Sequence, residues 1–509
     1  MDNDWNHLNQ TVIDLLQNGK PDAALEPAQA SVDRARQEKG DAHPDLALSL
    51  NNLGEILHAL GEFAQAEPLL RQSLAIYETA FGTDDETVAE ALVNLAELHV
   101  SQQRLSDAEP LMRRALAIRK TNMASDDPGL VPTLDGLAMI HQAQGDAGSA
   151  EELLRQSLSI LEKSLPDNHP DLGPALCRLA DIVHCAGKPE EAEAYFRRTL
   201  AIYEKSIGSL HPAFAKVLSQ LSEVYLARGL ISAAEPLLVQ SLEIRRATLS
   251  EDHPEIADSL NLLAMLHQTK NQPEKAESLM KESIAIYGRA FGETHPATAQ
   301  AQNNLADVYL NQGRADDAKP LLKVSLASRE KIFGPNHPIV AQSLNNLAVC
   351  RDQLGEYDKA ESLHLRALDI RRTAFGSDHP ATTQSLDNLA ATYRSQFRVE
   401  EAEKLLKQSL AIWEKSEGPD HPATAQAFSN LGFLYASDAR YPEAETALKR
   451  ARQIVEKKLG PDSRHLATIF ETLSLIYEKM GKTGESMEFA ARAHKIRKPQ
   501  QMRKSQSFT

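Results

Sequence analysis

Residues 334–350 read GPNHPIVAQSLNNLAVC, and close copies of this stretch return along the chain. GETHPATAQAQNNLADV begins at residue 292, GSDHPATTQSLDNLAAT at 376 and GPDHPATAQAFSNLGFL at 418. Each copy is displaced from its neighbour by 42 residues. A fixed period of this size is typical of an array of stacked structural units, each too small to fold alone.

Two positions extend this register over the whole chain. A leucine stands at one position of every unit: Leu53, Leu95, Leu137, Leu179, Leu221, Leu263, Leu305, Leu347, Leu389, Leu431 and Leu473. Thirteen residues later stands an alanine: Ala66, Ala108, Ala150, Ala192, Ala234, Ala276, Ala318, Ala360, Ala402 and Ala444, with Ala24 one period before and Ser486 one period after. The register therefore covers twelve units, up to about residue 498, without an insertion.

The pattern within one unit predicts two helices. AQSLNNLAVCRDQL, residues 341–354, has apolar residues at a period near 3.6, and the proline before it suits a first helical turn. Gly355 is expected to end this helix in a left-handed conformation. EYDKAESLHLRALDIRRTAF then forms the second helix, as far as Gly376. The small residues Ala348 and Ala360 allow the two helices to approach closely, so the sequence predicts an all-α stack of helix pairs.

The His-Pro dipeptide marks where each first helix begins. It occurs at His43, His169, His211, His253, His295, His337, His379 and His421. The residue before a proline is driven out of the helical region, so a structural role is expected. The histidines stand in successive units rather than at metal-ligand spacing, and we expect no metal site.

The motif L-x-x-L-A/G, followed by a glycine and then by the alanine of the second helix, resembles the tetratricopeptide repeat. The 42-residue period with HPxxAxSLNNLA and AExLLxxSLAI is similar to the variant found in kinesin light chains and many bacterial proteins. The resemblance implies a right-handed superhelical solenoid of about twelve helix-turn-helix repeats, whose first helices line a concave peptide-binding groove. A kinesin light chain has a motor-binding coiled coil ahead of its repeats. Here the first unit begins within ten residues of Met1, so we expect no motor attachment.

The register divides the chain into four parts. Residues 1–42 are expected to form an N-terminal capping repeat, 43–462 ten full repeats, and 463–498 a C-terminal repeat and cap. Residues 499–509 form a basic tail that we expect to be disordered.

Composition narrows the function. A net charge of −16 disfavours nucleic-acid and anionic-membrane binding, and no leader or membrane-spanning run is visible, so we expect a cytoplasmic protein. Three cysteines cannot build a disulfide framework. No arrangement of nucleophile, base and oxyanion donor is visible. We therefore expect no enzyme, no cofactor and no small-molecule substrate, but a scaffold or adaptor with a protein or peptide partner.

A stripe of amides on the first helices is the candidate peptide-binding surface. Four consecutive units carry Gln300 and Asn304, Gln342 and Asn346, Gln384 and Asn388, and Gln426 and Asn430; Asn52 and Asn94 take the asparagine position in earlier units. We call these residues the amide ladder. Amides both donate and accept hydrogen bonds, as an extended peptide backbone requires, and in related repeat proteins asparagines at this position hold a ligand's main chain. The alternative is that these amides bind the neighbouring helix or face water.

The middle of the chain departs from the ladder. Met139, Leu262 and Met265 could form an apolar pocket, although plain packing is the commoner use of methionine. Acidic residues on the first helices (Glu55, Glu90, Glu97, Asp181 and Glu223) favour a partner with Lys or Arg, unless they are simply a solvated acidic face. A different class of function also stays open, in which the chain is a regulatory or sensor subunit that binds a folded partner through its convex or edge surface.

Overall fold

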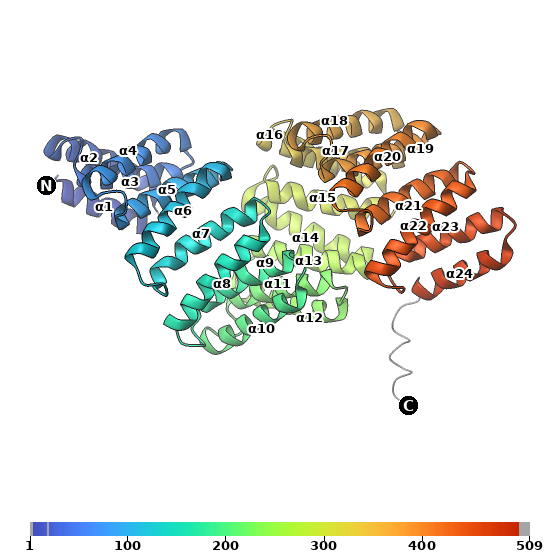
Figure 1. The fold of residues 1–509 in the computed structure, drawn as a ribbon, viewed down its shortest axis with the longest axis horizontal. Coiled ribbons are helices and arrows are strands. Elements are labelled where there is room, and N and C mark those ends of the chain that lie inside the picture. The colour runs from blue at the N-terminus through green and yellow to red at the C-terminus, as the bar shows by residue number, and fades with distance from the viewer. Residues whose placement is uncertain (1–3, 18–19, 498–509) are drawn as a thin grey trace. The chain divides into compact units, whose positions relative to one another are not determined.

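The computed structural model describes residues 4–17 and 20–497, which form 24 α-helices in twelve consecutive pairs and no β-strand (Figure 1). The chain separates into two compact units, which we call unit 1 (Met1–Leu249) and unit 2 (Ser250–Thr509). Each is described here by itself. The all-α fold and the paired helices confirm the expectation from the 42-residue register. The basic tail, residues 499–509, lies outside the described residues.

The first helix of each pair is called an A helix and carries an odd number. The A helices are α1 (Trp5–Gln17), α3 (Pro44–Ala59), α5 (Glu86–Ser101), α7 (Val131–Ala143), α9 (Leu172–Cys185), α11 (Pro212–Ala227), α13 (Pro254–Thr269), α15 (Pro296–Asn311), α17 (Pro338–Gln353), α19 (Thr383–Ser395), α21 (Pro422–Ser437) and α23 (His465–Lys479). Short 3₁₀ turns, Pro128–Leu130 and Pro380–Thr382, precede α7 and α19.

The second helix of each pair is called a B helix and carries an even number. The B helices are α2 (Pro21–Lys39), α4 (Phe63–Phe81), α6 (Leu105–Asn122), α8 (Ala147–Ser164), α10 (Pro189–Ser206), α12 (Ile231–Thr248), α14 (Pro273–Phe291), α16 (Ala315–Phe333), α18 (Tyr357–Phe375), α20 (Val399–Ser416), α22 (Tyr441–Leu459) and α24 (Thr483–Arg497).

The His-Pro histidines cap the A helices. In all eight, the ring Nδ1 accepts a hydrogen bond from the backbone N–H two residues later, at 3.1–3.3 Å. Asp85 and Asp127, which replace the histidine in two units, accept the same bond at 2.9 and 2.8 Å. The histidine thus satisfies a backbone donor at the helix start, a side-chain role that the proline argument alone had not included.

The turn between the A and B helices requires a left-handed residue. Gly61, Gly355 and the other described glycines at this position have φ between 72° and 84°, and Asn271 has φ 56°, as expected. The same conformation is also adopted by Gln103, Phe397 and Ala439, where no glycine marked the turn in the sequence. The geometry of the repeat therefore holds even where the local residue disfavours it.

The core of each pair follows the two sequence positions that fixed the register. The eleven leucines, from Leu53 to Leu473, are at most 4 % exposed, and the alanines from Ala24 to Ala444 are fully buried. Small residues also occupy the position of Ala348: a Cβ on Gly432 would lie 2.5 Å from Leu448 of the paired B helix. Close approach of A and B helices thus depends on small side chains on both.

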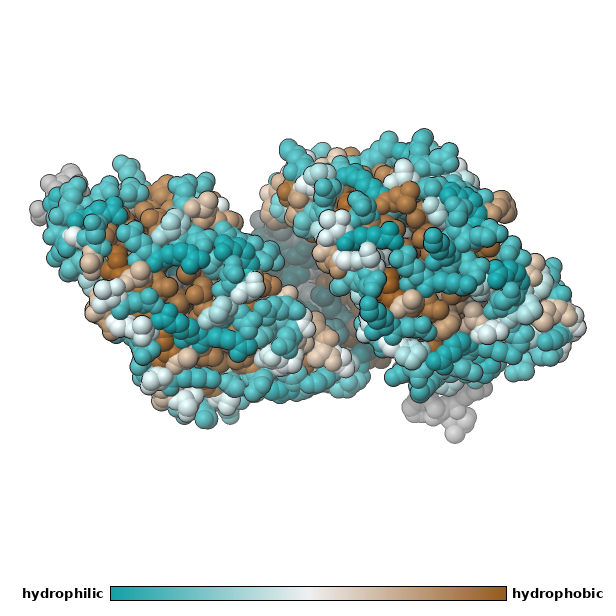
Figure 2. Space-filling model, turned by 45° about the horizontal axis from the view of Figure 1, so that its top comes forward, coloured by the Kyte–Doolittle hydropathy of each residue, from teal (hydrophilic) through white to brown (hydrophobic). Residues whose placement is uncertain are grey.

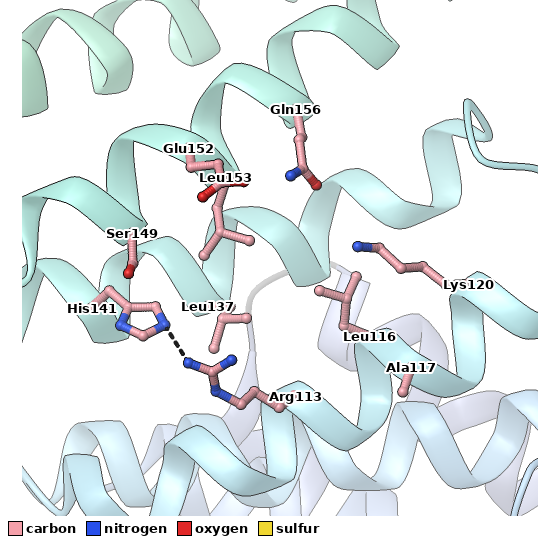
Figure 3. A pocket seen from close by; sticks show the side chains of 10 residues that line it. All are labelled: Arg113, Leu116, Ala117, Lys120, Leu137, His141, Ser149, Glu152, Leu153 and Gln156. Atoms are coloured by element: carbon pink, nitrogen blue, oxygen red, sulfur yellow. Dashed lines mark hydrogen bonds between the residues drawn. The ribbon is translucent and has the colours of Figure 1, made fainter.

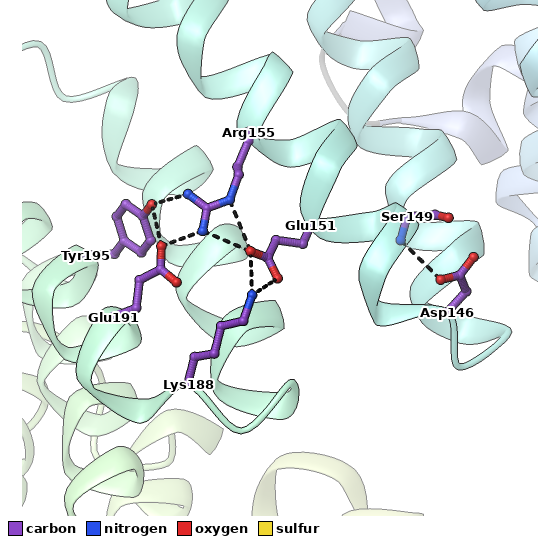
Figure 4. A network of polar contacts seen from close by, with 7 residues as sticks. All are labelled: Asp146, Ser149, Glu151, Arg155, Lys188, Glu191 and Tyr195. Atoms are coloured by element: carbon purple, nitrogen blue, oxygen red, sulfur yellow. Dashed lines mark hydrogen bonds and ion pairs between the residues drawn. The ribbon is translucent and has the colours of Figure 1, made fainter.

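Polar contacts link each B helix to the following pair. In unit 2, Glu277 of α14 accepts hydrogen bonds from the Tyr309 hydroxyl (3.1 Å) and the Arg314 guanidinium (2.8 Å), which stacks 4.3 Å from the tyrosine ring. Between α8 and α10 of unit 1, Glu151 accepts from Lys188 and from Arg155 (Figure 4). These partly exposed pairs fix how neighbouring repeats align more than they stabilise the fold.

One link carries the opposite charges. Lys319 replaces the glutamate of the B helix, and Glu356 replaces the arginine of the turn. The pair is kept, with Lys319 Nζ 2.8 Å from Glu356 Oε1, and Arg351 contacts the same carboxylate. The contact between these two neighbouring repeats of unit 2 is therefore preserved although both charges are reversed.

Candidate peptide-binding surface

The A helices form the inner side of each unit. Within a unit, successive A helices such as α15, α17 and α19 contact one another more than successive B helices do. The stack therefore curves towards its A helices. The exposed positions of those helices lie on the concave side, which is where the amide ladder was expected.

The glutamines and asparagines of the ladder differ in exposure. Gln300, Gln342, Gln384 and Gln426 are exposed, and the asparagines four residues later on the same helices are half-buried. Asn52 of α3 is only 8 % exposed. The two residues at i and i+4 lie on one face of each helix, as the spacing predicted.

Several ladder asparagines bind the preceding A helix. Asn52 Nδ2 donates to Asn9 (3.0 Å), Asn94 Nδ2 to Asn51 (3.0 Å) and Asn430 Nδ2 to Asp387 (3.1 Å). For these three residues, the interhelical alternative describes the observed contacts. Their loss would disturb the helix stack as well as any bound ligand.

Other ladder amides bind side chains of their own A helix or of an adjacent B helix. Gln300 Nε2 donates to Asn304 at 2.8 Å, and Gln426 Nε2 donates to Asn430 at 2.9 Å. The oxygens of Gln300 and Gln384 accept from arginines of the B helices, at 2.5 and 2.8 Å. These pairs fix the orientation of the amides on the concave face.

Three ladder side chains are open. Gln342, Asn346 and Asn388 make no side-chain hydrogen bond to any described residue. They lie on the neighbouring helices α17 and α19. Their donors and acceptors are therefore available on the concave face of unit 2.

The Asn-Asn pair of the repeat divides between core and surface. Asn303 and Asn345 stand one residue before ladder asparagines and are only 2 % and 1 % exposed. Asn345 Nδ2 donates to Ser385 Oγ (2.9 Å), and its oxygen contacts His364 Nδ1 (2.9 Å). In α15 and α17 the first asparagine of the pair thus serves the core, whereas in α3 the first, Asn51, is half-buried and the second, Asn52, is buried. Sequence analysis did not single out the first asparagine, although its position, 100° from the ladder, would have indicated it.

Acidic side chains follow another concave position in unit 1. Glu55, Glu97, Asp181 and Glu223 are related by multiples of 42 residues. Desolvation by the surrounding helices raises the pKa of all four carboxyl groups. Glu90 is exposed elsewhere on α5. The negative charges of the four carboxylates at the shared position, which were expected to attract a basic partner, are therefore not fully balanced by nearby cations.

The methionines of this position are exposed. Met139 of unit 1 is 56 % exposed and Met265 of unit 2 is 48 % exposed, while Leu262 is half-buried. Plain packing therefore does not describe the two methionines. Met139 adds apolar surface to the concave face of unit 1, and Met265 adds it to that of unit 2.

The hollows between B helices lie on the opposite, outer side. Figure 2 shows narrow apolar strips between hydrophilic ridges on the drawn face. Between α6 and α8, two adjoining hollows of about 360 and 750 Å³ share Lys120, Glu152 and Gln156. Leu137 and His141 of α7 line the smaller hollow, where Arg113 Nη2 donates to His141 Nε2 at 3.2 Å (Figure 3). The outer side thus also offers a candidate surface.

Two further properties bear on function. Over residues 4–17 and 20–497, no helix combines the length and apolar character needed to cross a membrane. The same residues contain no cluster of three or more His, Cys, Asp or Glu side chains suited to a metal ion.

Comparison with solved structures finds proteins that are similar to parts of this chain. The Q17M variant of nearly identical TPR-like repeats from a Podosopora anserina protein of kinesin light chain type is 28 % identical, covers 41 % of this chain and 98 % of its own, and gives a TM-score of 0.36. BtubC (BKLC) from P. vanneervenii is 24 % identical, with 48 % and 91 % covered and a TM-score of 0.36. The apo form of RapI is 16 % identical, with 57 % and 99 % covered and a TM-score of 0.43. No curated protein matches the sequence.

The family model described as "Tetratricopeptide repeat" matches along almost the whole chain, at residues 8–79, 51–121, 130–205, 214–289, 272–331, 297–373, 353–415, 381–457 and 424–498. These matches support a role in protein–protein interaction. The resemblance inferred from the repeated motif is confirmed: the chain belongs to the tetratricopeptide-repeat family.

Proposed function

We propose that this protein is a scaffold or adaptor that holds an extended segment of a partner protein on the concave face of unit 2. The supporting observation is the open set of amides, Gln342, Asn346 and Asn388, on adjacent A helices. A peptide backbone presents one donor and one acceptor per residue, and an amide side chain can pair with both. The surrounding ladder amides are already oriented by internal hydrogen bonds.

The test combines Gln342→Ala, Asn346→Ala and Asn388→Ala in the full-length protein. Each lost hydrogen bond to a ligand backbone costs about 1 kcal/mol, so the variant should bind a partner's segment roughly a hundredfold more weakly. Because these side chains have no internal partner, its melting temperature should stay near that of the wild type. Calorimetric titration with a mapped partner segment measures the change.

The matched control is Arg113→Ala with Lys120→Ala on the outer side, which should leave the affinity unchanged. Equal affinity of the wild type and the triple-amide variant, both folded, would remove the amide ladder from the binding site.

The acidic side chains of unit 1, at the shared position and at Glu90, add a preference for Lys or Arg in the part of the partner that contacts them. Glu90→Gln with Glu97→Gln should weaken only ligands with basic residues, and most at low salt, because exposed charges are screened over about 10 Å at 0.1 M ionic strength. An equal loss for a ligand without basic residues would contradict this preference.

A second candidate function is a regulatory subunit that binds a folded partner through its outer side. The hollows between α6 and α8 favour it, since they combine an apolar lining with Lys120, which forms no ion pair with a described residue. In that case the Arg113 and Lys120 control would lose binding and the amide variant would keep it.

A further inference from the structure

An apolar hollow lies between the first two B helices of unit 1. Its walls are α2 and α4, its floor is the A helix α3, and its volume is about 990 Å³ (Figure 1). The hollow at the equivalent place between α6 and α8 measures only about 360 Å³ (Figure 3), and the one between α14 and α16 about 380 Å³. The α2–α4 hollow is therefore more than twice as large as either of these.

The α2–α4 hollow is larger because a polar contact between repeats is missing there. In unit 2, a B-helix glutamate accepts hydrogen bonds from a tyrosine and an arginine of the next repeat: Glu277 from Tyr309 and Arg314, Glu361 from Tyr393 and Arg398, and Glu403 from Tyr435 and Arg440. We call this arrangement the polar link. The same three positions at α2 and α4 hold Leu25, Leu57 and Glu62. The acceptor and both donors of the polar link are thus replaced together.

The replacements leave apolar surface open to solvent. Leu25 of α2 is 36 % exposed, where other B helices carry the glutamate of the polar link. Leu60 and Leu69 are half-buried on the other side of the α2–α4 hollow. A partner that covers these side chains removes apolar surface from water, which favours binding.

An acidic rim borders the end of the α2–α4 hollow at which both B helices begin. Asp22, Glu26 and Glu62 are exposed there, and none of them forms an ion pair with a residue of the described ranges. At the other end, Arg36 already pairs with Asp41 at 3.1 Å. The uncompensated charge of the rim is therefore negative, and a partner with cations at this end complements it.

The lining favours a helix over an extended chain. Four floor leucines follow one face of α3 over roughly 15 Å, at ~1.5 Å per residue: Leu50, Leu53, Leu57 and Leu60. This length matches about three turns of a helix. The walls are helices whose backbone groups are paired internally, so an extended chain would leave its own N–H and C=O groups unpaired against leucines. A bound helix satisfies its backbone by itself and places one apolar face in the groove.

We propose that the α2–α4 hollow binds a helical segment of a partner protein, which carries an apolar stripe of three turns and Lys or Arg at the end that meets the acidic rim. This surface lies on B helices of unit 1 and does not involve the amide ladder. It is therefore a second interaction surface, beyond the proposed function.

The experiment uses full-length protein and three labelled fourteen-residue peptides. The first has leucines at i, i+3, i+7 and i+10, two lysines in its last turn, where cations also favour the helix itself, and alanine or glutamine elsewhere. The second has glutamates in place of the lysines. The third has the composition of the first, with leucines at every second position. Fluorescence anisotropy should show the first peptide binding at least tenfold more tightly than either of the others.

Restoring the polar link should close the hollow. Leu25→Glu with Leu57→Tyr and Glu62→Arg installs the residues of the other repeats, so it should weaken the first peptide at least tenfold and melt at or above the wild-type temperature. Leu25→Glu alone changes a partly exposed side chain and should also weaken binding, which keeps the test valid if the triple-link variant unfolds.

The matched control is Arg113→Ala with Lys120→Ala, which alters the equivalent hollow between α6 and α8 and should keep the affinity. The triple-amide variant of unit 2 should keep it as well.

Several results would overturn the proposal. They are equal binding of the first peptide and either of the others, no binding of the first peptide, and full affinity in the folded triple-link variant. A wild-type dimer in sedimentation that Leu25→Glu dissociates would instead assign the α2–α4 hollow to a second copy of this chain. Peptide binding that requires deletion of residues 498–509 would assign it to the chain's own basic tail, and either result would also overturn the proposal.

Discussion

Replacing Asp387 with asparagine should stabilise unit 2 at neutral pH. Asp387 lies on α19, half-buried on the concave side. Its Oδ2 accepts the Asn430 hydrogen bond at 3.1 Å, and its Oδ1 has no hydrogen-bond partner among the described residues. Burial raises its pKa from the ordinary 3.8 to about 6. Asparagine has nearly the same shape and can still accept from Asn430, so the substitution removes the charge and little else.

The sign follows from proton binding. Between about pH 4 and pH 6 the folded protein binds more protons at Asp387 than the unfolded chain does. The wild type therefore loses stability as the pH rises through this window, and the whole destabilisation is present above about pH 6. A pKa difference of about two, at ~1.4 kcal/mol per pKa unit, sets a ceiling near 3 kcal/mol. Solvent at the concave surface reduces this to about 1–2 kcal/mol.

The assay is urea denaturation followed by the fluorescence of Trp413, with Trp5, the other tryptophan, replaced by phenylalanine. Trp413 lies on α20, which packs against α19 and α21. Asp387→Asn should raise the midpoint at pH 8, and the gain should shrink towards zero at pH 4. A variant that is less stable than the wild type at pH 8, or a gain that is constant with pH, would refute the assignment of an uncompensated carboxylate.

Three further predictions concern the stack. Ala318→Leu or Ala360→Leu should overpack the fully buried A–B contact and cost roughly 1–3 kcal/mol in denaturant melts, and neutrality would refute the contact. Deleting one whole 42-residue repeat, residues 295–336, should leave a protein that is still helical by circular dichroism, whereas deleting 20 residues should not. Equal loss of helicity from both deletions would contradict a linear array of repeats. Ala439→Gly should stabilise by up to about 1 kcal/mol because φ is 57° there, and Gly355→Ala (φ 72°) should destabilise; the reverse order would contradict the turn geometry.

The helix pairs and their core could be predicted because the repeat tests each position many times. Leu347 and Ala360 recur in almost every unit, so their burial follows from periodicity and from the need of each unit to pack on its neighbours. The left-handed turn at Ala439 could not be predicted from its own residue. It follows only from equivalence with the glycines of other repeats, since tertiary packing overrides the local preference.

The site was less accessible to sequence reasoning. A 42-residue period shows which residues are equivalent, but not which neighbour a side chain touches. Asn346 and Asn430 therefore looked alike, although Asn430 binds Asp387 and Asn346 has no partner among the described residues. For the same reason, the sequence did not single out Arg329 and Arg371, the B-helix arginines that contact ladder glutamines. Arg329 stands on a B helix among polar residues, and only the contacts with Ser343 and Gln300 bring its charge to the concave side.

Site-specific photo-cross-linking tests the central claim, that partners bind the concave face of unit 2, most directly. A benzoylphenylalanine is placed at Gln342 on the concave side or at Lys120 on the outer side, both of which are exposed. Each full-length variant is then irradiated with the same purified partner at the same concentration. The account predicts a cross-linked product from position 342 and none from position 120. A product from position 120 alone, with both variants folded, would contradict it and assign binding to the outer surface.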